Sequence, residues 1–148
     1  MAVQPIPEGF HTVTPYLICK GADQVIDFMK AAFSAEVKSR MDNDDGTVTH
    51  ADLQVGDSRV MISEAGGRYE PMQCMLHLYV EDCDAVYRKA LDAGATSVQE
   101  VADQFYGDRS GGVQDVAGNQ WWISTHVEDV DPEETARRGE EYKASSSS

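Results

Sequence analysis

Apolar and polar residues alternate over most of the chain, and two stretches break that alternation with helical spacing. Residues 22–33 and 83–93 place apolar side chains every three to four positions, which is typical of a helix packed on one face. Asp82 precedes the second stretch as an N-cap, and Gly94 follows it as a C-cap. The pattern therefore predicts two amphipathic helices among short strands.

Alternating segments between turn-forming residues predict eight strands. Asp131 and Pro132 then open a short acidic helix that we expect to run to about residue 142, and residues 145–148 are expected to be disordered. A turn over residues 106–108 is expected to precede the seventh strand. The expected strands are residues 12–20, 36–42, 47–55, 59–64, 75–81, 96–102, 111–116 and 120–126.

The two halves of the chain are an internal repeat with an offset of 61 residues. Asp23-Gln24-Val25 matches Asp84-Ala85-Val86, and Ile62-Ser63 matches Ile123-Ser124 at the same offset. Each half reads β-α-β-β-β and has too little apolar surface to fold alone, so the halves must share a core. We expect one α+β domain over residues 1–148, with modules at 11–65 and 74–127 and an acidic tail at 128–148.

Composition and charge exclude some classes of binding partner and indicate where the protein is located. The 148 residues carry a net charge of −14, which disfavours nucleic acids and anionic membranes as partners. The three cysteines form no close pair, and the first residues lack a basic segment followed by an apolar one. We therefore expect reduced thiols and a cytoplasmic location. Cys19, on the apolar side of its strand, is expected to act as a small hydrophobe.

Five motifs, in this order along the chain, resemble the glyoxalase/bleomycin-resistance/dioxygenase (vicinal oxygen chelate) superfamily, and most of all its PhnB-like branch. The resemblance implies that each module curls its strands into a half-open cup, with one face on the helices and the other lining a cavity. It also implies two-fold dimers with cavities near the subunit contact. The motifs are Thr14-Pro15-Tyr16-Leu17, residues 22–28, His50-Ala51-Asp52-Leu53, residues 106–112 and residues 118–123.

Metal-dependent members of that superfamily hold a divalent ion with His, Glu or Gln at four cavity positions. The resemblance places Thr14, Met61, Met75 and Trp122 at those positions. These side chains cannot form the charged or imidazole shell that such an ion needs. We therefore predict no metal cofactor at the usual site; the alternative is a divalent ion held by a displaced set of ligands.

Strand alternation assigns the remaining cavity residues. With Thr14 and Met75 facing inward, the alternation sends Val13, Pro15 and Leu17, and likewise Leu76, Leu78 and Val80, to the helix side. His50 and His77 then face the cavity, where they are candidates for general acid or base, for a displaced metal site with Asp52 or Glu64, or for a purely structural role. The candidate ligand-binding residues are Tyr16, Met61, Met75, His77, Tyr79, Trp122 and Arg59.

For the polar residues near these positions, an ion pair is the simpler alternative to a role in ligand binding. Arg59 is a candidate contact for a ligand carboxylate, against the commoner fate of a surface ion pair. Asp108 and Arg109 are expected to form an ion pair within their hairpin. The alternative for the apolar and aromatic candidates is that they fill the cup as core residues and bind no ligand. Trp121, on the opposite face from Trp122, is expected in the core.

The sequence thus predicts a metal-free protein that binds a small organic molecule in the cavity between the cups. The alternative is an enzyme, a divalent-metal-dependent lyase, isomerase or dioxygenase acting on vicinal oxygens; an interaction module is the third class. Open sheet edges and the resemblance predict a homodimer. Its contact is expected at the first strand, with Tyr16 and Ile18, and at the tail helix after Pro132.

Overall fold

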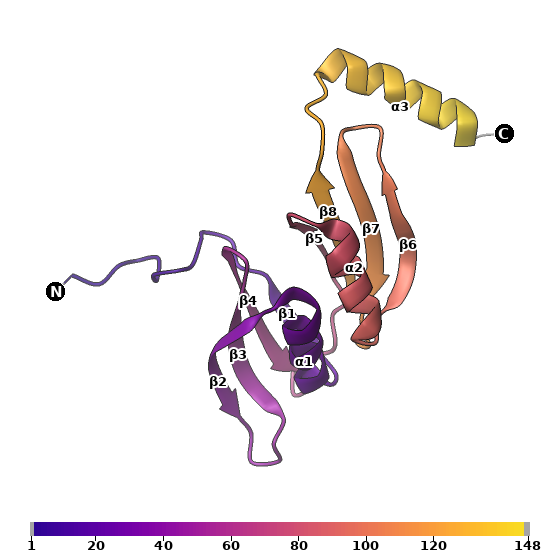
Figure 1. Cartoon of the computed structure of the whole chain (residues 1–148). Coiled ribbons are helices and arrows are strands. Elements are labelled where there is room, and N and C mark those ends of the chain that lie inside the picture. Colours follow the sequence, from indigo (N-terminus) through magenta and orange to yellow (C-terminus); the bar gives the residue numbers. More distant parts are fainter. Residues whose placement is uncertain (1, 147–148) are drawn as a thin grey trace.

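Two βαβββ modules make up the body of the protein in a computed structural model that describes residues 2–146 (Figure 1). Module one contains β1 (Tyr16–Cys19), α1 (Ala22–Phe33), β2 (Glu36–Asp42), β3 (Val48–Val55) and β4 (Ser58–Glu64). Module two contains β5 (Met75–Tyr79), α2 (Cys83–Asp92), β6 (Thr96–Asp103), β7 (Asp108–Gln114) and β8 (Gln120–His126), and α3 (Pro132–Ser146) follows. This is the α+β architecture that the hydrophobic pattern predicts.

Each module forms a mixed four-stranded sheet, and the two sheets share one register. The strand orders are β1-β4-β3-β2 and β5-β8-β7-β6, with a parallel pair at one edge and antiparallel pairs elsewhere. Tyr16 pairs with Met61 in the first sheet, and His77 pairs with Trp122 in the second. Tyr16 and His77 are 61 residues apart, and so are Met61 and Trp122. The repeat seen in the sequence is therefore also a repeat of backbone pairing.

The helices join the modules through a common core. Figure 1 shows α1 and α2 side by side between the two sheets, and the two helices are in contact. Phe28 and Phe33 of α1 pack against Trp121 of β8, with ring centroids 6.2 and 4.9 Å apart, respectively. Trp121 is fully buried, as expected. Burial of such a large apolar surface across the boundary ties the modules together.

The first strand is shorter than the alternation predicts. Strand pairing begins at Tyr16, and Val13 is 82% exposed instead of lying on the helix side. The reason lies at Pro15, which has no N–H to donate, although its carbonyl accepts the N–H of Met61 at 2.9 Å. The prediction that Val13 belongs to the core was therefore wrong.

The seventh strand starts three residues earlier than predicted. Tyr106-Gly107-Asp108 has turn chemistry, yet β7 already begins at Asp108 and pairs there with His126 of β8. The turn is closed by Gly107, whose φ of +103° suits glycine. This correction matters for function, because it places the Asp108 side chain on a sheet instead of in a loop.

Local capping fixes both module helices. The carboxylate of Glu64 accepts hydrogen bonds from the N–H groups of Gly21 at 2.8 Å and Ala22 at 3.1 Å, so it closes the start of α1. Asp82 caps α2 as predicted, accepting from the N–H of Ala85 at 3.2 Å. Glu64 is thereby committed to the helix start.

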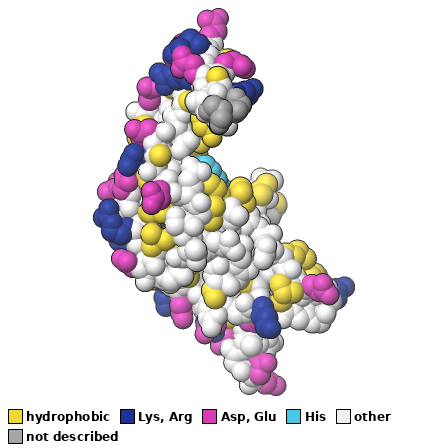
Figure 2. All heavy atoms as spheres, turned by 90° about the vertical axis from the view of Figure 1, so that its right-hand side faces the viewer, with side chains coloured by type: hydrophobic (Ala, Val, Ile, Leu, Met, Phe, Trp, Pro, Cys, Tyr) yellow, Lys and Arg dark blue, Asp and Glu magenta, His cyan; other side chains and the backbone are white. Residues whose placement is uncertain are grey.

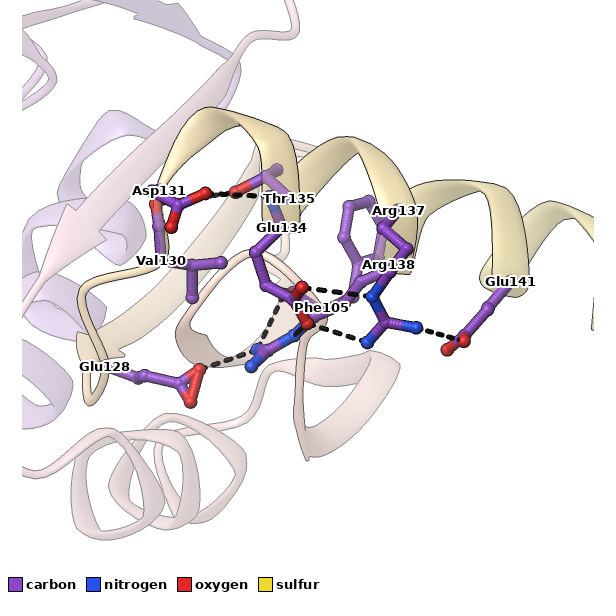
Figure 3. Close-up of polar contacts among 9 residues, drawn as sticks. All are labelled: Phe105, Glu128, Val130, Asp131, Glu134, Thr135, Arg137, Arg138 and Glu141. Atoms are coloured by element: carbon purple, nitrogen blue, oxygen red, sulfur yellow. Dashed lines mark hydrogen bonds and ion pairs between the residues drawn. The ribbon is translucent and has the colours of Figure 1, made fainter.

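The tail helix α3 crosses the far end of module two, where Arg138 bonds it to residues outside the helix (Figure 3) and Tyr142 packs against Phe105. Asp131 caps it by accepting the N–H of Glu134 at 2.8 Å, and the helix continues to Ser146, four residues past the predicted end. Arg138 bonds Glu134 at 3.0 Å, Glu128 at 2.6 Å and the carbonyl of Phe105 at 3.3 Å. Residues 145 and 146, predicted to be disordered, are helical, and 147–148 lie outside the described residues.

The cysteines are free thiols within this fold. Cys19 and Cys83 are each 1% exposed, and Cys74 is half-buried. Burial raises the pKa of the Cys19 thiol to about 11, which keeps it protonated and unreactive near neutral pH. Among residues 2–146, no helix combines the length and the apolar character that crossing a bilayer requires.

Candidate functional site

Apolar and aromatic side chains of module two lie exposed on the face of the sheet opposite α2. Met75 and Tyr79 of β5 are 66% and 64% exposed, and His77 lies between them on the same face. Trp122 of β8 is the register partner of His77 and is half-buried. Figure 2 shows, below the charged tail helix, a hollow where hydrophobic side chains and a histidine reach the surface. We call the four residues Met75, His77, Tyr79 and Trp122 the module-two face.

A buried carboxylate organises one end of the module-two face. Asp108 is 3% exposed; it accepts the hydroxyl proton of Tyr79 at 2.7 Å, and its other oxygen contacts Nδ1 of His126 at 2.8 Å. Burial raises the pKa of Asp108, but the hydrogen bonds from His126 and Tyr79 outweigh burial and hold this pKa below its ordinary value. Asp108 is therefore an anion beneath the exposed tyrosine.

His126 lies between two carboxylates. Its Nε2 contacts Asp129 at 2.8 Å, so both ring nitrogens face oxygens that can only accept hydrogen bonds. The hydrogen bonds to Asp108 and then Asp129 raise the pKa of His126. The imidazolium form thus links β7 to the segment that leads into α3.

Two serines lie under His77. Ser124, fully buried, donates its hydroxyl proton to Ser110 at 2.7 Å, and the same Ser124 oxygen lies 2.9 Å from Nε2 of His77. Ser110 is 2% exposed. No buried side-chain nitrogen or oxygen within residues 2–146 is left without a hydrogen-bond partner. Each buried polar side-chain atom beneath the module-two face therefore has at least one hydrogen-bond partner.

The corresponding face of module one is occupied by ion pairing. Arg59 contacts Asp52 at 2.6 Å with both side chains largely buried, and its Nε bonds Gln54 at 2.7 Å. Phe10 covers the guanidinium, 4.8 Å from the ring centroid. Arg59 is thus part of a largely buried ion pair instead of a surface one, and His50 on this face contacts the Tyr16 hydroxyl at 3.1 Å.

The two faces approach each other at their β1 and β5 edges. A cleft of about 300 Å³ lies there, and Tyr16, Met75 and His77 all line it. A larger groove of about 650 Å³ runs along β5, and His77, Tyr79 and Lys89 are among its lining residues. Leu76, Leu78 and Val80 line it as well. We predicted these three residues in the core, and they are only partly buried, because this groove separates them from module one.

The expected metal positions offer no ligands that suit a divalent ion. Thr14, Met61, Met75 and Trp122 carry one hydroxyl, two thioethers and an indole, which do not fit such an ion. Across residues 2–146, no three His, Cys, Asp or Glu side chains gather as a metal-binding group. Glu64 and Asp52, the carboxylates considered for a displaced site, are bound to the start of α1 and to Arg59 respectively.

Sequence reasoning missed four residues beneath the module-two face. Ser124 and His126 continue the alternation of β8 from Trp122, and Asp108 and Ser110 are their register partners on the neighbouring strand β7. The expected pair of Asp108 with Arg109 was wrong, because neighbours on a strand point to opposite faces. Arg109 instead bonds Asp84 at 2.8 Å and Asp103 at 3.3 Å. Extending the alternation past Trp122 would have found the histidine.

This pair of cup-shaped modules is the architecture of a known class of small proteins. Residues 9–123 match the model of the Glyoxalase/Bleomycin resistance protein/Dioxygenase superfamily, and the chain belongs to that superfamily. Relatives in Mycobacterium include the uncharacterized proteins Mb0911c of M. bovis and Rv0887c of M. tuberculosis. Each is 34% identical over an alignment of 133 positions, which covers 82% of this chain and 88% and 78% of those proteins respectively.

Solved structures carry the same fold. TioX from Micromonospora sp. ML1 aligns with a TM-score of 0.69 and 26% identity over 79% of this chain and 99% of its own. A PhnB protein from Bacillus cereus, described as a putative 3-demethylubiquinone-9 3-methyltransferase, aligns with a TM-score of 0.60 and 19% identity over 78% and 99% of the two chains. The second likeness establishes the fold alone.

Proposed function

We propose that this protein binds a small organic molecule between its cup faces without the metal site of the metal-dependent members, and that it belongs to the PhnB-like branch. The observation that carries this proposal is the exposure of Tyr16 and Met75 in the cleft between the modules, with Tyr79 exposed on the same face as Met75. Their exposed fractions are 46%, 66% and 64%. Large apolar side chains gathered in a hollow are typical of ligand sites.

The chemistry of the face supports an aromatic or otherwise flat ligand. Trp122 offers a ring surface, and the thioether of Met75 adapts to different shapes. The cleft of about 300 Å³ is at the small end of ligand pockets, so a ligand of one or two rings suits it. Binding, sequestration or delivery of such a molecule is the role that we propose; free thiols fit a cytoplasmic location.

The proposal is tested by thermal shift and equilibrium dialysis against a panel of aromatic compounds. We expect at least one to raise the melting temperature in a concentration-dependent way. Tyr79→Phe and Met75→Ser should weaken that binding, whereas Tyr142→Phe and Val116→Ser should not. These controls alter residues of similar exposure, 57% and 68%, that lie on α3 and in the β7–β8 turn. Unchanged binding by both cup variants would contradict the proposal.

Metal analysis separates this proposal from the metal-dependent enzyme. We load the purified protein with Zn²⁺, Ni²⁺ or Mn²⁺ and then remove free ion by dialysis. We expect the protein to retain less than one ion per chain. A stoichiometric ion that disappears in His77→Ala would favour the enzyme instead.

We also propose that two copies associate as a homodimer. The outer edge of β5 has no strand partner within residues 2–146, and both cup faces leave apolar side chains exposed. β1 and α3 are the elements proposed at the contact. Light scattering at two ionic strengths tests it: the dimer should strengthen with salt, because each chain carries −14. A monomer at micromolar concentration in both buffers would rule it out.

A further inference from the structure

The direction of each hydrogen bond beneath the module-two face determines what the face offers to a ligand. Ser124 has a single hydroxyl proton and donates it to Ser110. Its oxygen can therefore meet Nε2 of His77 only as an acceptor, at 2.9 Å. It follows that Nε2 of His77 carries a proton and that, in the neutral ring, Nδ1 has a free lone pair.

The hydrogen-bond direction of the Tyr79 hydroxyl is fixed as well. Its hydroxyl donates to the buried Asp108 at 2.7 Å, so the phenol oxygen has only lone pairs left for a ligand. The hydrogen bond to Asp108 also raises the pKa of Tyr79, which keeps the phenol protonated. The ring centroids of His77 and Tyr79 lie 5.1 Å apart, so one small ligand can touch both side chains.

Trp122, Gln120 and Arg59 add no donor at this point. The indole N–H of Trp122 is bound to the side-chain oxygen of Gln120 at 3.1 Å. The amide donor of Gln120 lies at the far end of the face, in register with Met75. Arg59, the cation of the opposite face, is bound to Asp52. His77 and Tyr79 thus present acceptors to a ligand, while the charge of Asp108 is paired with His126 and Lys89 lines the groove along β5 with them.

We infer that the module-two face selects organic molecules that present a hydrogen-bond donor, a hydroxyl or an amine, to His77 and Tyr79, and that it discriminates against carboxylates. This inference rests on the proposed function and names its ligand class. A carboxylate placed against His77 and Tyr79 would meet two lone pairs and receive no hydrogen bond from either side chain. Ser124 acts as a positioning residue, because it fixes the His77 tautomer without reaching the surface.

The test compares three naphthalene probes that share one ring system. We expect 2-naphthol to bind about tenfold more tightly than the donor-free 2-fluoronaphthalene in equilibrium dialysis at neutral pH, and 2-naphthoate to bind more weakly than either. Ser124→Ala should bring the ratio of the first two dissociation constants close to one while the fluoro compound still binds. The control is Ser63→Ala, at the equivalent repeat position in module one, which should leave the ratio unchanged.

Nitrogen-15 NMR of the histidine rings gives a second readout that needs no ligand. We expect the neutral His77 ring to show a protonated Nε2 and an unprotonated Nδ1 in wild type, and a mixture of tautomers in Ser124→Ala. Equal binding of 2-naphthol and 2-fluoronaphthalene, or a protonated Nδ1, would overturn the inference while leaving the proposed function standing. If no aromatic compound binds, the proposed function itself fails, even with the expected tautomer.

Discussion

The indole of Trp122 lies on the bare backbone of Gly112, its register partner on β7. A Cβ atom at position 112 would lie 2.9 to 3.0 Å from three adjacent ring atoms of the indole, which places it over the ring face. Only a residue without a side chain lets the tryptophan settle on the sheet in this way. The position of the largest apolar surface in the proposed site therefore depends on a glycine two strands away from β5.

We predict that Gly112→Ala displaces Trp122 and weakens ligand binding. The added methyl group should lift the indole from the sheet, at a cost of about 1–2 kcal/mol in the free energy of unfolding. A rise in tryptophan accessibility to acrylamide quenching measures the displacement, because Trp121 stays fully buried. Val116→Ser, in the β7–β8 turn, serves as the control. Unchanged quenching would show that the indole does not rest on Gly112.

The clamp at His126 predicts a pH dependence of stability. Asp108 and Asp129 raise the pKa of His126 in the fold, so its stabilising contribution is fully present below the unfolded pKa of about 6.5. That contribution is lost as the pH rises through the raised, folded-state pKa. Urea unfolding of wild type and His126→Gln between pH 5.5 and 9 should therefore differ most at the acid end. The two stability curves should converge at high pH.

His11→Gln is the matched control for that experiment, since His11 contacts a backbone carbonyl, that of Asp57 at 3.3 Å. This variant should follow the wild-type pH curve. A His126→Gln curve parallel to wild type over the whole range would contradict an imidazolium clamp.

A close approach at Gly107 predicts an unusually costly substitution. A Cβ there would lie 2.2 Å from the carbonyl oxygen of Glu128, and φ is +103°. Gly46 has a similar φ of +89° but open space around it. We expect Gly46→Ala to cost about 1 kcal/mol from backbone strain alone, and Gly107→Ala about 2 kcal/mol more. Equal losses in chemical denaturation would mean that the tail segment moves aside freely.

Attachment of α3 is predicted to depend on Arg138 and not on its neighbour. Arg138 reaches outside the helix to Glu128 and to the Phe105 carbonyl, whereas Arg137 bonds only Glu134 and Glu141 within it (Figure 3). Arg138→Ala should speed amide exchange in the tail helix about fivefold, and Arg137→Ala should change it little. Similar exchange in both variants would mean that the contact between Phe105 and Tyr142 holds the helix.

How much of this could be predicted from the sequence depends on whether local chemistry and tertiary contact agree. The α1 boundaries were predicted correctly, because apolar spacing coincides with the buried face from Ala22 to Phe33. The start of β7 was missed, since Gly107-Asp108 looks like a turn and only pairing with His126 extends the strand. Ser110 and Ser124 carry no sequence signal of a network, as their role comes from lying beneath His77.

The common register of the two sheets makes the modules interchangeable parts for protein engineering. Tyr16 and Met61 occupy the same backbone positions as His77 and Trp122, so side chains can be transferred at an offset of 61 residues without redesigning strand pairing. Moving the His77–Trp122 pair onto β1 and β4 would ask whether one chain can carry two recognition surfaces. It would also show how far a duplicated half is free to diverge while its copy preserves the fold.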